Sequence, residues 1–207
     1  MEKRLIEKEP DVPNLTKEEI DTISKACFRA DDTLEPADLI FVFGSSHYVQ
    51  ELSETVCGLL EKKLANKVFV TGGIPKYTDS KKIDKPESLL ILDHIKTDKY
   101  RDVLFYNETV SRNTLENVTE ALKVLDFSKF NKIIYVFKAH ASGRGYLTLK
   151  RFLPNTKLMQ KTFNVTYHDG AEEITKDNWY KTDFGRRRVY GEYLRIQTIP
   201  GYSKLVH

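Results

Sequence analysis

The sequence is poor in the residues that mark the most easily recognised protein classes. It holds two cysteines, Cys27 and Cys57, in 207 residues, far fewer than small disulfide-stabilised secreted proteins use. Both lie in apolar helical patterns, which predicts buried thiols. Neither a Cys-x-x-Cys pair nor the histidine spacing of a zinc site occurs, so no metal centre is expected.

Long hydrophobic stretches are also missing. No run of about 18 apolar residues occurs, and we therefore expect no membrane-spanning helix. The charged opening segment MEKRLIEKEPDVPNL lacks the apolar core of a signal peptide, so a cytoplasmic location is expected. The 33 basic and 30 acidic side chains nearly cancel, which argues against a dedicated nucleic-acid-binding protein.

Short β-branched and aromatic runs alternate with segments of helical period. Expected strands are 39–43, 68–71, 103–106, 133–137 and 158–165; expected helices are about 16–30, 49–65, 86 onward, 113–125, 142–152 and much of 172–198. Continuously apolar strands are typical of a sheet covered on both faces. Their alternation with helices predicts right-handed crossovers and parallel pairing.

We therefore predict a doubly wound, Rossmann-like α/β sheet of about five mainly parallel strands in the order 3-2-1-4-5. The chain is expected to form one domain over 1–207, with a core at about 37–165 and a helical C-terminal extension at 166–207. The N-terminal helix should begin with a capping box, because Glu19 stands three residues after Thr16.

Polar loops follow the first four expected strands, and ligands of such sheets bind at the carboxyl ends of the strands. The candidate ligand-binding residues in the first two loops are Gly44, Ser45, Ser46, Gly72 and Gly73. The glycines either permit tight turns or let a ligand approach the backbone at a helix N-terminus. Neither a G-x-G-x-x-G nor a P-loop motif is present.

The third loop supplies Glu108 and the further candidates Ser111, Asn113, Thr114 and Asn117. Helix capping accounts for part of this cluster, and a bound ligand is the alternative. Glu108 follows a buried strand, where a carboxylate needs a partner. It could act as a general base, accept a ribose hydroxyl, pair with Arg144 or hold a backbone amide.

His140 and Arg144 lie at the start of the fourth expected crossover helix. The guanidinium of Arg144 suits a phosphate or carboxylate, or a local acidic partner. His140 is a candidate catalytic residue, together with Glu87 and Glu108. In the second loop, Lys81, Lys82 and Lys85 suggest a lid.

The C-terminal segment from Arg186 to Arg195 mixes arginines with aromatic residues. Contact with nucleic acid is one interpretation. The alternative is a helix that packs its apolar residues inward and leaves its arginines in solvent, and it is favoured.

Several of these segments together resemble the DUF218 family of YdcF-like proteins, which is related to SanA- and ElyC-like proteins. The resemblance covers about 38–158. It includes Asp38 to Gly44, Thr71-Gly72-Gly73, Glu87-Ser88 and, most specifically, Glu108-x-x-Ser111-x-Asn113-Thr114-x-Glu116-Asn117. Arg144 and the segment Arg188-x-x-Gly191-Glu192-x-x-Arg195-Ile196 also match. The family usually places a histidine three residues before the arginine that corresponds to Arg144, where this chain has Ala141 beside His140.

The resemblance implies a Rossmann-like fold and a binder of nucleotide-like or S-adenosyl compounds, or an enzyme acting on envelope lipid carriers. We therefore expect an anionic, phosphate- or nucleotide-bearing ligand, with a nucleotide or S-adenosyl-methionine as the implied cofactor. If the protein is an enzyme, hydrolysis or group transfer at phosphate is the first expectation. The alternatives are a non-catalytic binding module and, more weakly, nucleic-acid contact through the basic C-terminal segment.

Overall fold

The computed structural model describes residues 6–45, 47–74, 84–167 and 172–199. The chain divides into two compact units. The sheet unit comprises 31–137 and 148–163, and the terminal unit comprises 1–30, 138–147 and 164–207. The single domain expected from the sequence stays a prediction.

The sheet unit is built on a five-stranded sheet in the order β3-β2-β1-β4-β5. Its strands are β1 (Leu39–Val42), β2 (Lys67–Val70), β3 (Leu104–Asn107), β4 (Lys132–Lys138) and β5 (Lys157–Phe163). The β1–β2, β2–β3 and β1–β4 pairs are parallel. The predicted α/β class, the mainly parallel sheet and the strand order are therefore confirmed.

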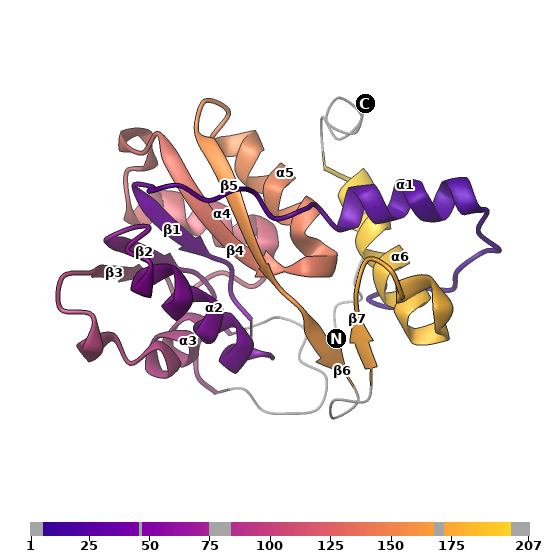
Figure 1. The fold of residues 1–207 in the computed structure, drawn as a ribbon, viewed down its shortest axis with the longest axis horizontal. Helices are drawn as coiled ribbons and strands as arrows, with labels where there is room; N and C mark the ends of the chain where they lie inside the picture. Colours follow the sequence, from indigo (N-terminus) through magenta and orange to yellow (C-terminus); the bar gives the residue numbers. More distant parts are fainter. Residues whose placement is uncertain (1–5, 46, 75–83, 168–171, 200–207) are drawn as a thin grey trace. The chain divides into compact units, whose positions relative to one another are not determined.

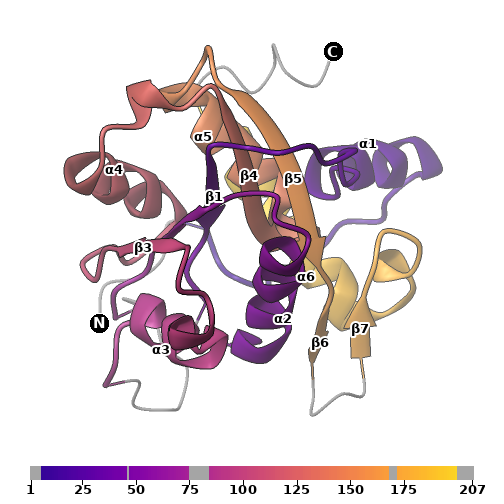
Figure 2. The same cartoon turned by 60° about the vertical axis from the view of Figure 1, so that its left-hand side comes forward.

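Helices follow the first four strands. They are α2 (Val49–Glu61), α3 (Glu87–Ile95), α4 (Thr114–Val124) and α5 (Ser142–Phe152), with short 3₁₀ turns η1 (Thr97–Lys99) and η2 (Phe127–Lys129). In Figures 1 and 2, α2 and α3 lie on one face of the sheet and α4 on the other. This is the arrangement that right-handed crossovers produce when the strand order reverses after β3.

The central strands are buried on both faces because helices cover both. All four residues of β1 are 0% exposed. The ring of Phe41 stacks on Phe69 at 6.2 Å between centroids, and Phe127 packs edge-on against Phe41 at 5.9 Å. The edge strand β3 is less covered, and Leu104 at its start is 55% exposed.

The terminal unit contains α1 (Lys17–Cys27), η3 (Ala139–Ala141), the antiparallel pair β6 (Val165–Tyr167) and β7 (Glu172–Ile174), η4 (Trp179–Lys181) and α6 (Asp183–Gln197). Its core gathers Cys27, Trp179, Val189 and Ile196, each 0% exposed. The Trp179 indole N–H donates to the Ser24 hydroxyl at 2.8 Å. The capping box predicted at Thr16 and Glu19 is confirmed.

Several expected element bounds and one burial prediction differ from the structure. The helix expected at 49–65 ends at Glu61. The N-terminal helix ends at Cys27 instead of continuing to Ala30. The expected strand 158–165 ends at Phe163. Val165 instead begins β6, which pairs with β7. This strand pair lies at the start of the tail that was expected to be largely helical. The last helix is confined to 183–197. Cys27 is buried as predicted, but Cys57 is only half-buried.

Candidate functional site

The carboxyl ends of β1 and β2 are tied together by one threonine. Thr71 is 0% exposed, and its hydroxyl donates to the Val42 carbonyl at 3.0 Å while accepting the Gly44 N–H at 3.1 Å. Its own N–H donates to the same carbonyl at 2.9 Å. The turns that leave the two strands therefore start from a fixed position.

Glu87 lies directly against the two glycines that leave β1 and β2. A β-carbon on Gly44 would stand 2.6 Å from Glu87 Oε2 and 2.8 Å from the Gly72 Cα. At Gly72, which has φ +123°, a β-carbon would meet the Glu87 Cβ at 2.7 Å and Oε2 at 3.0 Å. Any side chain would displace the carboxylate, so both glycines serve to admit Glu87 over the strand ends.

The backbone at the start of α3 fixes this carboxylate. The Glu87 N–H donates to the Gly73 carbonyl at 3.1 Å, and the Ser88 N–H donates to Gly72 at 2.9 Å. Glu87 is the first residue of the helix, following Pro86 at the N-cap position. A negative charge in the first turn also interacts favourably with the helix dipole.

Glu108 is buried and accepts four hydrogen bonds from its own surroundings. It is 4% exposed. Its Oε1 accepts the Gly72 N–H at 2.6 Å and the Ser111 hydroxyl at 2.5 Å, and its Oε2 accepts the N–H groups of Val110 and Ser111 at 2.8 and 2.9 Å. Of the roles considered from the sequence, holding backbone amides is the one this geometry displays.

The rest of the third loop divides into a buried pair and a helix cap. The Asn117 amide donates to the Ser111 hydroxyl at 2.6 Å, and the Ser111 carbonyl accepts the Gly73 N–H at 2.8 Å. Asn113 is the N-cap of α4 and accepts the Glu116 N–H at 3.0 Å. Thr114 is the first residue of that helix. The structure thus brings the second- and third-loop candidates into one hydrogen-bonded rim.

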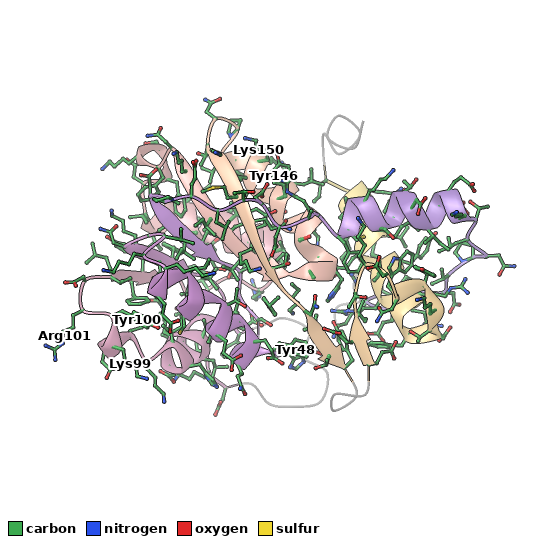
Figure 3. All side chains as sticks on the ribbon, viewed as in Figure 1. Tyr48, Lys99, Tyr100, Arg101, Tyr146 and Lys150 are labelled. Atoms are coloured by element: carbon green, nitrogen blue, oxygen red, sulfur yellow. The ribbon has the colours of Figure 1, made fainter. Side chains whose placement is uncertain are left out.

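The first loop is only partly described. The Ser45 side chain is 2% exposed and donates to the His47 carbonyl, while Ser46 lies outside the described residues. Tyr48, labelled in Figure 3, precedes α2 with φ 64° and provides no side-chain cap. In the proposed lid, Lys81 and Lys82 are also outside the described residues, and Lys85 pairs with Asp93.

His140 belongs to the terminal unit and is completely buried. It is 0% exposed, its Nε2 lies 3.3 Å from the Tyr167 hydroxyl, and its Nδ1 has no hydrogen-bond partner within the part of the chain that the structure describes. Burial first, and then the charge of Arg188, holds the pKa of His140 well below its usual value. The neutral ring is therefore the favoured form in the folded protein.

Arg144, also in the terminal unit, is engaged by an acid from α6. Its Nε donates to Glu192 Oε2 at 2.7 Å, and Arg195 donates to Oε1 of the same carboxylate at 3.2 Å. Burial would raise the pKa of Glu192, which is 3% exposed, but Arg144, Arg195 and Arg188 hold it well below its usual value. Of the two partners expected from the sequence, a bound anion or a local acidic side chain, Arg144 has the second.

The arginines of α6 have partners within the terminal unit. Arg186 donates to the Pro13 carbonyl at 3.0 Å, and Arg187 to the Glu9 carbonyl at 2.9 Å and Asp11 at 2.7 Å. Arg188 donates to the Tyr167 hydroxyl at 3.1 Å, and Arg195 to the Glu7 carbonyl at 2.7 Å. The basic segment thus binds the N-terminal segment 7–13, which sequence reasoning did not anticipate.

The terminal unit also holds a pocket of about 410 Å³, which was not expected from the sequence. Its lining comes from α1, from the turn after β7 and from η4: Lys17, Ile20, Asp21, Ser24, Lys176, Asp177 and Tyr180. Within the described ranges, no three His, Cys, Asp or Glu side chains gather closely enough to hold a metal ion. Nor is any described helix both long and apolar enough to cross a membrane.

Comparison with known proteins finds no match to this chain, either among protein-family models or among curated proteins.

Proposed function

We propose that the sheet unit binds a small molecule of the nucleotide or S-adenosyl class, with hydroxyls and a phosphate or carboxylate group, beside Glu87, as expected for a YdcF-like protein of the DUF218 family. The observation that carries the proposal is the carboxylate of Glu87 placed over Gly44 and Gly72. These glycines leave β1 and β2, next to the point between β1 and β4 where the strand order reverses. Ligands of open α/β sheets bind at that point.

The chemistry of the rim suits a ribose-like group. An ionised carboxylate only accepts hydrogen bonds, and its two oxygens can take two neighbouring hydroxyls. Glu108 is unsuited to this task because its oxygens already accept four hydrogen bonds. Because Glu87 lies against the glycines that leave β1 and β2, it is the residue we assign to hydroxyl recognition, and to activation of water if the ligand is hydrolysed.

The anionic part of the ligand is assigned to the start of α2. Among the described residues, the N-cap residue Tyr48 makes no side-chain capping hydrogen bond to this helix, whereas Asn113 caps α4. The first N–H groups of a helix and its dipole favour phosphate and carboxylate. Because Arg144 is paired with Glu192, the proposal does not depend on an arginine clamp.

The test is a titration of the protein with AMP, ADP, ATP, S-adenosyl-methionine and ribose 5-phosphate, followed by calorimetry and thermal shift. A ligand at a hundred times its Kd should stabilise the protein by about 2.7 kcal/mol. Glu87→Gln should weaken binding by about tenfold, equivalent to about 1.4 kcal/mol. Glu61→Gln is the matched control, because Glu61 is an exposed carboxylate at the far end of α2.

Absence of binding across the panel, or equal affinities for the wild type and Glu87→Gln, would refute the proposal. Product formation on prolonged incubation would favour a hydrolase or transferase. Saturable binding without product would favour the non-catalytic binding module.

A further inference from the structure

Two exposed apolar side chains stand beside the candidate rim. Val110 is 65% exposed and Ile74 is 47% exposed. A single exposed apolar residue is ordinary, but the backbone of both residues adjoins the same glycine. A β-carbon on Gly73 would stand 2.8 Å from the Val110 carbonyl carbon, and Ile74 follows Gly73 in the chain.

Val110 is held in place although it is exposed. Its N–H donates to Glu108 Oε2 at 2.8 Å, and the next residue, Ser111, donates to the same oxygen at 2.9 Å. Valine has one side-chain torsion, which is stiff. Because the buried Glu108 carboxylate holds its backbone, the Val110 side chain loses little conformational entropy when a ligand contacts it.

The apolar pair and Glu87 meet the same two-residue turn. The Glu87 side chain lies against Gly72 and the Val110 backbone against Gly73, and the Cα atoms of adjacent residues are about 3.8 Å apart. A ligand whose hydroxyls reach Glu87 therefore has its next few atoms within reach of Val110 and Ile74.

From this juxtaposition we infer that Val110 and Ile74 contact the base, or an equivalent flat apolar group, of the ligand and so select nucleosides over simple sugar phosphates. The inference rests on the proposed site beside Glu87. A second copy of the chain is the less suitable occupant, because two side chains offer far less than the roughly 800 Å² per partner that a stable interface buries.

The experiment compares AMP with ribose 5-phosphate, which lacks the base, by calorimetry. Val110→Ser should weaken AMP binding about five- to twentyfold and leave the affinity for ribose 5-phosphate unchanged. Ile74→Ser should act in the same direction. Val124→Ser is the matched control, because Val124 is 53% exposed at the opposite end of α4, and it should leave both affinities unchanged.

The outcomes separate this inference from the proposed function. If AMP and ribose 5-phosphate bind and Val110→Ser weakens both equally, or neither, the base contact is wrong while the site beside Glu87 stands. If neither compound binds the wild type, the proposed function fails and the inference fails with it. A change in sedimentation caused by Val110→Ser, without selective loss of AMP, would identify the pair as a self-association surface and overturn the inference.

Discussion

Replacing Glu108 by Gln tests whether this carboxylate holds the candidate rim together. Glutamine keeps the shape of the side chain but exchanges one acceptor oxygen for an NH₂ donor. If the NH₂ group takes the place of Oε1, the Ser111 hydroxyl can rotate to accept from it, but the buried Gly72 N–H loses its partner. The other orientation leaves the N–H groups of Val110 and Ser111 without acceptors.

The smallest loss is therefore one buried N–H group without a partner, which costs about 1–3 kcal/mol. For a chain of this size that corresponds to a fall in Tm of between about 2 and 12 °C. Glu116→Gln is the control from the same loop. Glu116 lies on the surface and accepts from the Arg112 N–H and the Asn113 amide, so its replacement should cost under about 0.5 kcal/mol.

Thermal and urea unfolding followed by circular dichroism would measure both variants, and amide hydrogen exchange would locate the change. The amides of Gly72, Val110 and Ser111 should exchange faster in Glu108→Gln, whereas those of α2 should not. A Glu108→Gln protein as stable as Glu116→Gln, with unchanged exchange at these three amides, would refute the assignment of Glu108 as the residue that positions this rim.

Two further predictions concern stability. Gly143→Ala should prevent folding or lower the free energy of unfolding by more than about 4 kcal/mol, because the added β-carbon would collide with the Ala26 carbonyl oxygen. Gly58→Ala should instead stabilise α2 by about 0.5–1 kcal/mol, because nothing lies within 4 Å of the added β-carbon. Equal effects of the two substitutions in urea unfolding would contradict both expectations. Because burial and Arg188 lower the pKa of His140, the unfolded chain binds a proton at higher pH than the folded one. Stability should therefore fall by up to about 1.4 kcal/mol per unit as the pH drops below about 6.5, and His140→Gln should reduce that slope when unfolding is measured from about pH 6.5 to 5; an unchanged slope would rule out a buried, neutral His140.

The fold was predictable because its strands are locally distinct. The runs in β1, β2 and β4 are apolar on both faces, which only a doubly covered sheet requires, and the crossover rule then restricts the strand order. The errors arose where neighbouring residues of similar composition belong to two different sheets. Residues 158–165 read as one strand, yet Val165 leaves β5 and pairs with Ile174 in a different sheet, a choice that depends on tertiary contacts.

The location of the rim was predictable for a similar reason, but the role of each acid was not. Glu87 and Glu108 both follow strands of the sheet in the sequence, and both were candidate bases or hydroxyl acceptors. Only the structure shows that Gly72 lies between them, with its N–H bonded to Glu108 and its Cα against Glu87. The Glu108 carboxylate holds backbone amides and the Glu87 side chain packs against two glycines, and the sequence has no signal that separates these two arrangements.

The basic segment of α6 shows why a charge pattern is a weak guide to partners. Arg186 and Arg187 bind carbonyl groups of Pro13 and Glu9, more than 170 positions away in the chain. Gly191 is what allows this approach, because a β-carbon there would stand 2.6 Å from the Lys8 carbonyl oxygen. The bound segment also carries acidic side chains, and Arg187 pairs with Asp11 at 2.7 Å, so backbone carbonyls and carboxylates both contribute to this contact. The same arginines that suggest nucleic acid in the sequence serve here to hold the N-terminal segment against α6, and the case for a ligand therefore rests on the sheet unit.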